Sequence, residues 1–148
     1  MELVAYLAQG LSVALEPQNL FLAFIGCAIG TLIGALPGLG PVNGVALMIP
    51  LTFNFSLSAT AALILLVSVY YGCMYGGRIS SILLNIPGDE PAMMTTLDGY
   101  PMAQQGRGGE ALGLTGVASF FGALVATAGL VLFAPVLVEF AIRFGPAE

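Results

Sequence analysis

The residues of this chain that can do chemistry gather around two turns with the same spacing. The pattern Pro-Gly-x-x-Pro occurs at residues 37–41 and again at 87–91. The first turn lies in a run between Glu16 and Arg78 that contains no charged side chain. Where a helix breaks, free N–H groups at the start of the next helix lie at a positive dipole end and can hold a carboxylate. The carbonyl groups that end the preceding helix can hold a small cation.

Polar groups close to both turns suit such a site. Hydroxyl, amide and carbonyl oxygens are ligands for a cation such as Na⁺, and glycine lets the backbone approach a ligand closely. Taken singly, each glycine is also typical of a plain tight turn, and each asparagine of a helix cap. Because the same pattern occurs at two turns, we favour the interpretation that these residues bind a ligand. The predicted substrate-binding residues are Gly38, Gly40, Asn43, Gly76, Gly77, Ser80, Ser81, Asn85 and Gly88.

The same inventory argues against an enzyme. The chain has no His and no Lys, and its two cysteines, Cys27 and Cys73, are isolated in apolar surroundings. No catalytic triad or metal cage can be assembled from these residue types, and the cysteines are typical of small buried side chains. We therefore expect no enzymatic activity, no resident metal and no cofactor, apart from a coupling Na⁺ or H⁺.

The charged residues near the second turn allow two interpretations each. Arg78 can pair with an anionic substrate through its planar guanidinium, or it can anchor a helix at the membrane interface. We expect Asp89, Glu90 and Asp98 in a solvated loop on the aqueous side, with a proton or cation relay as the alternative. Only three arginines and no lysines are present, so the charges do not orient the helices.

The composition is that of a membrane protein. Hydrophobic residues make up 58% and charged residues 7% of the chain, whereas soluble domains contain roughly 45–50% and about 25%. Hydrocarbon requires every backbone polar group to find a partner, so a helix break at membrane depth is tolerated only beside protein or a water-filled cavity. The net charge of −5 reflects a scarcity of bases. Nothing resembles a basic footprint for nucleic acid, and we expect no nucleic-acid partner.

The apolar segments predict an all-α membrane protein with about three full transmembrane helices and two short re-entrant or broken helices. A full span needs about 20 residues. The expected full spans cover residues 20–36, 57–77 and 111–138. The short segments, too short to cross, cover residues 42–53 and 79–86. We expect Pro50 to close the first short helix and Pro135 to kink or end the last span.

The remaining segments complete the predicted organisation. Residues 1–18 are expected to form an interfacial helix, with Pro17 early in the next helix. Residues 19–148 would be a partial transmembrane transport domain, a fragment of a longer subunit. Within it, Gly26, Gly30 and Gly34 share one helix face, where another helix can approach closely. Residues 92–110 are typical of a polar connection.

Three stretches resemble the large membrane subunit of the bacterial tripartite tricarboxylate transporters. They are Gly34 to Pro41, Tyr75 to Pro91, and Leu97 to Ala103 followed by Gly106-Arg107. The similarity runs from about Asn19 to Gly116 and continues more weakly to Pro146. It implies a multi-pass secondary transporter of the bacterial inner membrane that imports tricarboxylates or related carboxylates with an ion gradient.

The resemblance also implies partners and a location for the site. A small membrane subunit and a periplasmic solute-binding protein would act with this chain in the lipid bilayer. The turn at 37–41 and the stretch 76–88 are the candidate substrate and cation region. The alternative from another class is a non-transporting membrane scaffold or assembly subunit, in which the glycine faces serve only helix contacts.

Overall fold

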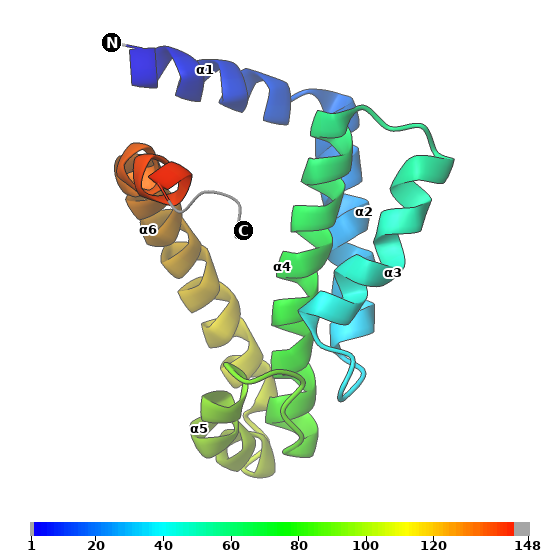
Figure 1. Ribbon diagram of the computed structural model, residues 1–148. Coiled ribbons are helices and arrows are strands. Elements are labelled where there is room, and N and C mark those ends of the chain that lie inside the picture. The colour runs from blue at the N-terminus through cyan, green and yellow to red at the C-terminus, as the bar shows by residue number, and fades with distance from the viewer. Residues whose placement is uncertain (1, 144–148) are drawn as a thin grey trace. The chain divides into compact units, whose positions relative to one another are not determined.

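The computed structural model describes residues 2–143, which form six helices (Figure 1). The helices are α1 (Glu2–Ala14), α2 (Pro17–Gly34), α3 (Pro41–Asn54), α4 (Ala59–Leu84), α5 (Met93–Gln104) and α6 (Gly108–Arg143). Met1 and residues 144–148, which include the predicted domain end at Glu148, lie outside the described residues. The chain up to Leu112 forms one compact unit, and a second unit begins at Gly113.

Three helices in the described part of the chain are long and apolar enough to cross a membrane. They are Pro17–Gly34, Ala59–Leu84 and the stretch Gly108–Ala134 of α6. The all-α class and the three predicted spans are therefore confirmed. Pro17 occupies the first turn of α2, as expected, where its missing N–H costs nothing. Large apolar side chains such as Phe24 and Val67 are exposed on these helices, which suits a hydrocarbon surrounding.

Helices α2 and α4 lie side by side and run in the same direction. Successive α2 glycines face successive turns of α4, in the pairs Gly26–Leu65, Gly30–Val69 and Gly34–Cys73. A Cβ atom at Gly26 would lie 2.8 Å from the Leu65 carbonyl oxygen, and one at Gly30 would clash with the Val69 backbone. Glycines of α4 likewise face the α2 backbone. The predicted glycine face of α2 is thus a close helix contact.

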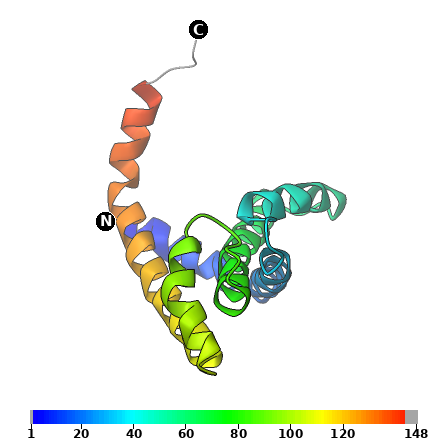
Figure 2. The same ribbon diagram turned by 90° about the horizontal axis from the view of Figure 1, so that it is seen from below.

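Helix α3 runs back along this pair and packs on α4. Gly44, near its start, lies against the Cys73 sulfur, and Met48 one turn later packs with Leu65 and Val69. Figure 2 shows the α2–α4 pair nearly end-on, with α3 extending away from it. Both cysteines are free thiols. With 14 residues, α3 is about 21 Å long and shorter than a bilayer core of about 30 Å.

The end of α3 differs from the prediction. The helix does not close at Pro50 but continues to Asn54. Proline removes one helical hydrogen bond, yet the following turn has others. The Phe55 N–H donates to the Leu51 carbonyl at 3.0 Å, and the buried Thr52 hydroxyl donates to the Ile49 carbonyl at 2.7 Å. Because Pro50 is exposed, its ring does not disturb the contact with α4.

The predicted boundary near residue 77 is wrong, because α4 is continuous from Ala59 to Leu84. Residues 79–84 are its last turns, so the second short helix does not exist as a separate element. The α2 backbone covers Gly76, and the hydroxyls of Ser80 and Ser81 donate to the Gly77 carbonyl at 3.0 and 2.7 Å. The helix ends at Asn85, which has the left-handed backbone common at helix ends (φ 59°).

The predicted polar connection 92–110 contains α5. Gly99 and Pro101 are typical of loops in a sequence, yet both lie within this helix. A Cβ atom at Gly99 would come within 2.7 Å of the Ile82 side chain. The glycine therefore lets α5 approach α4 closely.

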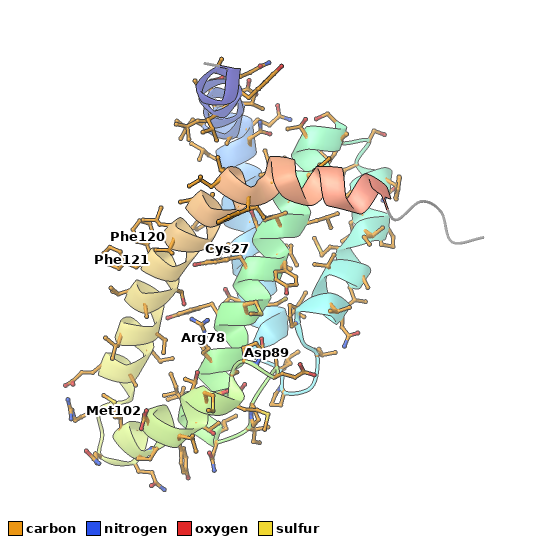
Figure 3. The ribbon with its side chains drawn as sticks, turned by 60° about the vertical axis from the view of Figure 1, so that its left-hand side comes forward. Cys27, Arg78, Asp89, Met102, Phe120 and Phe121 are labelled. Carbon is orange, nitrogen blue, oxygen red and sulfur yellow. The ribbon has the colours of Figure 1, made fainter. Side chains whose placement is uncertain are left out.

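Helix α6 starts with an exposed ion pair and passes through residue 135. Arg107 donates to Glu110 at 2.7 and 2.9 Å, and this hydrogen bond and the carboxylate charge raise the pKa of Arg107. The helix continues to Arg143, so Pro135 does not end it. Figure 3 shows the axis of α6 bending in its orange-to-red part, and the kink at Pro135 itself stays a prediction.

Candidate functional site

The two Pro-Gly-x-x-Pro turns lie at the same end of the parallel pair. The first follows α2 and the second follows α4. A Cβ atom at Gly40 in the first turn would lie 3.9 Å from the carbonyl oxygen of Gly88 in the second. Figure 1 shows both connections at the lower ends of α2 and α4. A site shared by the two turns requires this proximity.

The connection after α4 folds back along that helix. A Cβ atom at Gly88 would lie 2.6 Å from the Gly77 Cα atom and 3.2 Å from the Gly34 carbonyl oxygen. Gly77 lies seven residues before the end of α4, so the chain returns roughly 10 Å along the helix axis. Gly88 is buried, and any side chain there would strike the backbone of α4.

The start of α3 carries backbone donors without a side-chain cap. Gly40 precedes the helix with a left-handed backbone (φ 33°), and Pro41 occupies the first position without an N–H. The Gly44 N–H donates to the Gly40 carbonyl at 3.2 Å. Within the described residues, the N–H groups of Val42 and Asn43 have no hydrogen-bond acceptor. This uncharged helix start can attract a carboxylate through its dipole and its free donors.

The second turn differs, because its own side chain caps it. The Ala92 N–H donates to Asp89 Oδ1 at 3.0 Å and to the Asp89 carbonyl at 3.2 Å. The Met93 N–H donates to the Glu90 carbonyl at 3.2 Å. These donors ahead of α5 are therefore occupied. The two turns share a sequence pattern, but only the first presents free donors to an anion.

Asp89 is the residue that sequence reasoning misplaced. It is half-buried, and its Oδ2 atom is buried without a hydrogen-bond partner in the described part of the chain, so the prediction of a solvated loop is wrong for it. Its carboxylate packs on α4, with Oδ1 3.4 Å from the Cβ position of Gly77 (Figure 3). Glu90 and Asp98 are exposed, as predicted. The available signal was that Asp89 stands where the first turn has Leu39.

The predicted site residues divide into two sets. One set is buried at the lower end of α4 and in the returning connection: Gly76, Gly77, Ser80, Ser81 and Gly88. Gly40 lies beside this set, next to Gly88. The others are exposed: Gly38, Asn43 and Asn85. Gly38 (φ 87°) and Asn85 have the left-handed backbone that the turn and the helix end require. The structure therefore brings the first set and Gly40 together.

Arg78 lies next to Gly77 on α4 and is half-buried. Figure 3 shows Arg78 and Asp89 on different sides of α4. Among the described residues, the Oδ2 atom of Asp89 has no hydrogen-bond partner, so Arg78 does not satisfy it. Substrate pairing and interfacial anchoring both stay predictions for Arg78.

Free backbone donors at the start of a short helix, beside helices long enough to span a bilayer, are typical of secondary transporters with interrupted helices. The chain belongs to the Tripartite tricarboxylate transporter TctA family, which it matches over residues 20–148. The resemblance noted in the sequence is thereby confirmed.

One curated relative is an uncharacterized 52.8 kDa protein in the TAR-I ttuC' 3' region of Agrobacterium vitis. It is 43% identical over all 148 residues of this chain. The chain spans 29% of the length of that relative. No solved structure matches the chain.

Proposed function

We propose that this chain forms part of a membrane subunit that imports a tricarboxylate or a related carboxylate across the bacterial inner membrane, driven by a Na⁺ or H⁺ gradient. A small membrane subunit and a periplasmic solute-binding protein would act with it. Membership of the family supports the proposal. The single observation that carries it is the uncapped start of α3 beside the returning connection that bears Asp89.

The start of α3 would bind a substrate carboxylate through the N–H groups of Val42 and Asn43. Such a helix end is equivalent to about half a positive charge and contributes roughly 0.3–1 kcal/mol at an exposed position, up to about 2 kcal/mol when partly buried. A carboxylate held without a cationic side chain can be released again. A site that must both load and unload its substrate needs this modest affinity.

The depth of the turns supports a place on a transport path. The 26 residues of α4 measure about 39 Å, against about 30 Å for a hydrocarbon core. If α4 is centred in the bilayer, Gly77 lies roughly 7 Å inside the hydrocarbon boundary. Irregular backbone at that depth needs cover from protein or water. The contacts of Gly88 with α2 and α4 give such cover.

Uptake by the complete subunit, reconstituted into vesicles with its two partners, tests the proposal. We expect accumulation of labelled citrate or a related carboxylate that stops when the ion gradient is collapsed. A Gly10→Ala variant is a matched control, because no atom of the described residues lies within 4 Å of a Cβ atom at that position. Uptake that is unchanged by collapse of the gradient would reject gradient-driven transport.

The glycine-lined contact of α2 with α4 favours the alternative, a non-transporting scaffold. Gly38→Ala and Gly88→Ala discriminate between the two functions. Gly38 has a left-handed backbone and no neighbour in the described part of the chain within 4 Å of its Cβ position, so alanine there strains the turn without a clash. If a variant still takes up substrate but no longer assembles with the partner subunits, the result supports the scaffold function at these positions. If a variant assembles but no longer takes up substrate, the result supports the transport function.

A further inference from the structure

The second turn places a carboxylate oxygen where the described residues do not satisfy it. Asp89 Oδ1 accepts the Ala92 N–H, whereas Oδ2 is buried without a partner. A buried carboxylate oxygen that is left without a hydrogen-bond partner is unfavourable. The first turn carries the apolar Leu39 at the matching position, so the pattern Pro-Gly-x-x-Pro does not itself require an acid. A positively charged partner bound to the Oδ2 atom of Asp89 would remove this energetic cost.

Neutral oxygen atoms lie near the residue that precedes this carboxylate in the chain. Gly88, the preceding residue, has its Cβ position 3.2 Å from the Gly34 carbonyl oxygen and 3.4 Å from the Gly77 carbonyl oxygen. The Gly34 carbonyl belongs to the last turn of α2, and no backbone hydrogen bond of the described connection reaches it. The buried hydroxyls of Ser80 and Ser81 both donate to the Gly77 carbonyl. Each hydroxyl oxygen thus keeps lone pairs for another partner.

The charges nearby do not supply the missing partner. The chain has no His or Lys, Arg78 does not satisfy Oδ2, and Glu90 is exposed. Among the described residues, no three His, Cys, Asp or Glu side chains cluster as a multivalent metal site would need. A ligand set of one carboxylate and several neutral oxygens carries one negative charge, which a monovalent cation balances. Hard oxygen ligands suit an alkali cation better than a soft metal.

We propose that Asp89, with the carbonyl oxygen of Gly34 and the hydroxyls of Ser80 and Ser81, binds a monovalent metal cation of the size of Na⁺. The two turns then divide the work: the first presents donors to an anion, and the second holds the cation beside it. The role of this cation in driving uptake rests on the proposed function. The binding of the cation to the protein can be tested without the proposed function.

Thermal unfolding of the purified complete subunit tests the site without transport. The unfolding midpoint is measured while NaCl replaces choline chloride at constant ionic strength, with KCl as a second comparison. We expect Na⁺ to raise the midpoint of the wild type with saturation, because a ligand that binds only the folded state stabilises it. Asp89→Asn should lose this response. Glu90→Gln, which removes the adjacent exposed acid, should keep it.

Three results would overturn the assignment. The first is a wild-type midpoint that does not respond to Na⁺. The second is an Asp89→Asn variant that responds like the wild type. The third is stabilisation by acid alone without preference for Na⁺, which would make Asp89 a proton site.

A second variant keeps the test decisive if Asp89→Asn does not fold. Ser81→Ala keeps the carboxylate and removes one ligand, and it should raise the Na⁺ concentration at half-maximal effect severalfold. An unchanged concentration would contradict the ligand set. Uptake that ignores the Na⁺ gradient while Na⁺ still stabilises the protein would reject the transport role and leave the cation site intact.

Discussion

Replacing Gly88 with alanine should destabilise the protein much more than replacing Gly77, although these two glycines touch each other. A Cβ atom at Gly88 would lie 2.6 Å from the Gly77 Cα atom, whereas ordinary contact begins at 3.4 Å, a shortfall of 0.8 Å. The obstacle is helix backbone, which cannot rotate away. In the reverse substitution, the Cβ atom at Gly77 meets Asp89 Oδ1 at 3.4 Å and the Gly88 Cα atom at 3.5 Å, both ordinary contacts.

The two costs follow from these distances. Overpacking against a fixed backbone costs typically about 1–3 kcal/mol, so Gly88→Ala should lower the free energy of unfolding by that amount. Gly77→Ala should change it little or raise it, because alanine in a helix interior is favoured over glycine by about 0.5–1 kcal/mol.

The assay for this pair is unfolding of the complete subunit in detergent, followed for both variants under identical conditions. Folding of the connection back onto α4 predicts a lower midpoint for Gly88→Ala than for Gly77→Ala. Equal losses, or a larger loss for Gly77→Ala, would refute the backfolded connection. Citrate uptake on the same preparations shows whether displacement of the second turn also impairs transport.

Substitutions at Gly30, Asn85 and Arg107 test other parts of the structure. Gly30→Ala should lower the unfolding midpoint clearly, because its Cβ atom would meet the Val69 backbone, while Gly10→Ala should not; equal effects would contradict the close α2–α4 contact. Asn85→Gly should keep stability while Asn85→Val should lose about 1–2 kcal/mol, the cost of a left-handed backbone for a side chain with a branched Cβ. Arg107→Gln should leave the midpoint unchanged at low salt, because the pair with Glu110 is exposed on both sides; a large shift would contradict this.

The elements that face lipid could be predicted from the sequence. Hydrocarbon tolerates neither charges nor unpaired backbone, so uncharged runs of sufficient length mark the spans without knowledge of their neighbours. The spacing of Gly26, Gly30 and Gly34 likewise predicted a close helix contact, because a helix places these residues on one face. The sequence did not reveal that the partner is α4 running in the same direction.

The misplaced boundaries share a physical cause. The second span was predicted to end at residue 77, yet α4 passes through Gly76 and Gly77 because α2 and the returning connection need backbone without side chains there. Gly99 was likewise predicted to lie in a polar connection, but it lies within α5 and packs against Ile82. In each case tertiary contact, which local pattern does not contain, decides whether a glycine breaks a helix or packs it.

The candidate site was predicted in part for the same reason. The shared pattern of the two turns predicted a common region that contains Gly40 and Gly88, and the structure brings these two residues together. Asp89 was expected in water, since most acids beside Pro and Gly are in solvated loops. Its burial depends on the chain folding back by seven residues along α4, which no local signal encodes.

Reciprocal binding of the two ligands tests the central claim most directly. If the start of α3 holds a carboxylate and Asp89 holds a cation beside it, each ligand should tighten the binding of the other by the same factor. We expect the dissociation constant of citrate or a related carboxylate for the complete subunit, measured by titration calorimetry, to fall at least about fivefold when Na⁺ replaces choline, the lower end of common coupling strengths. An identical dissociation constant in both salts would contradict a shared site at the two turns.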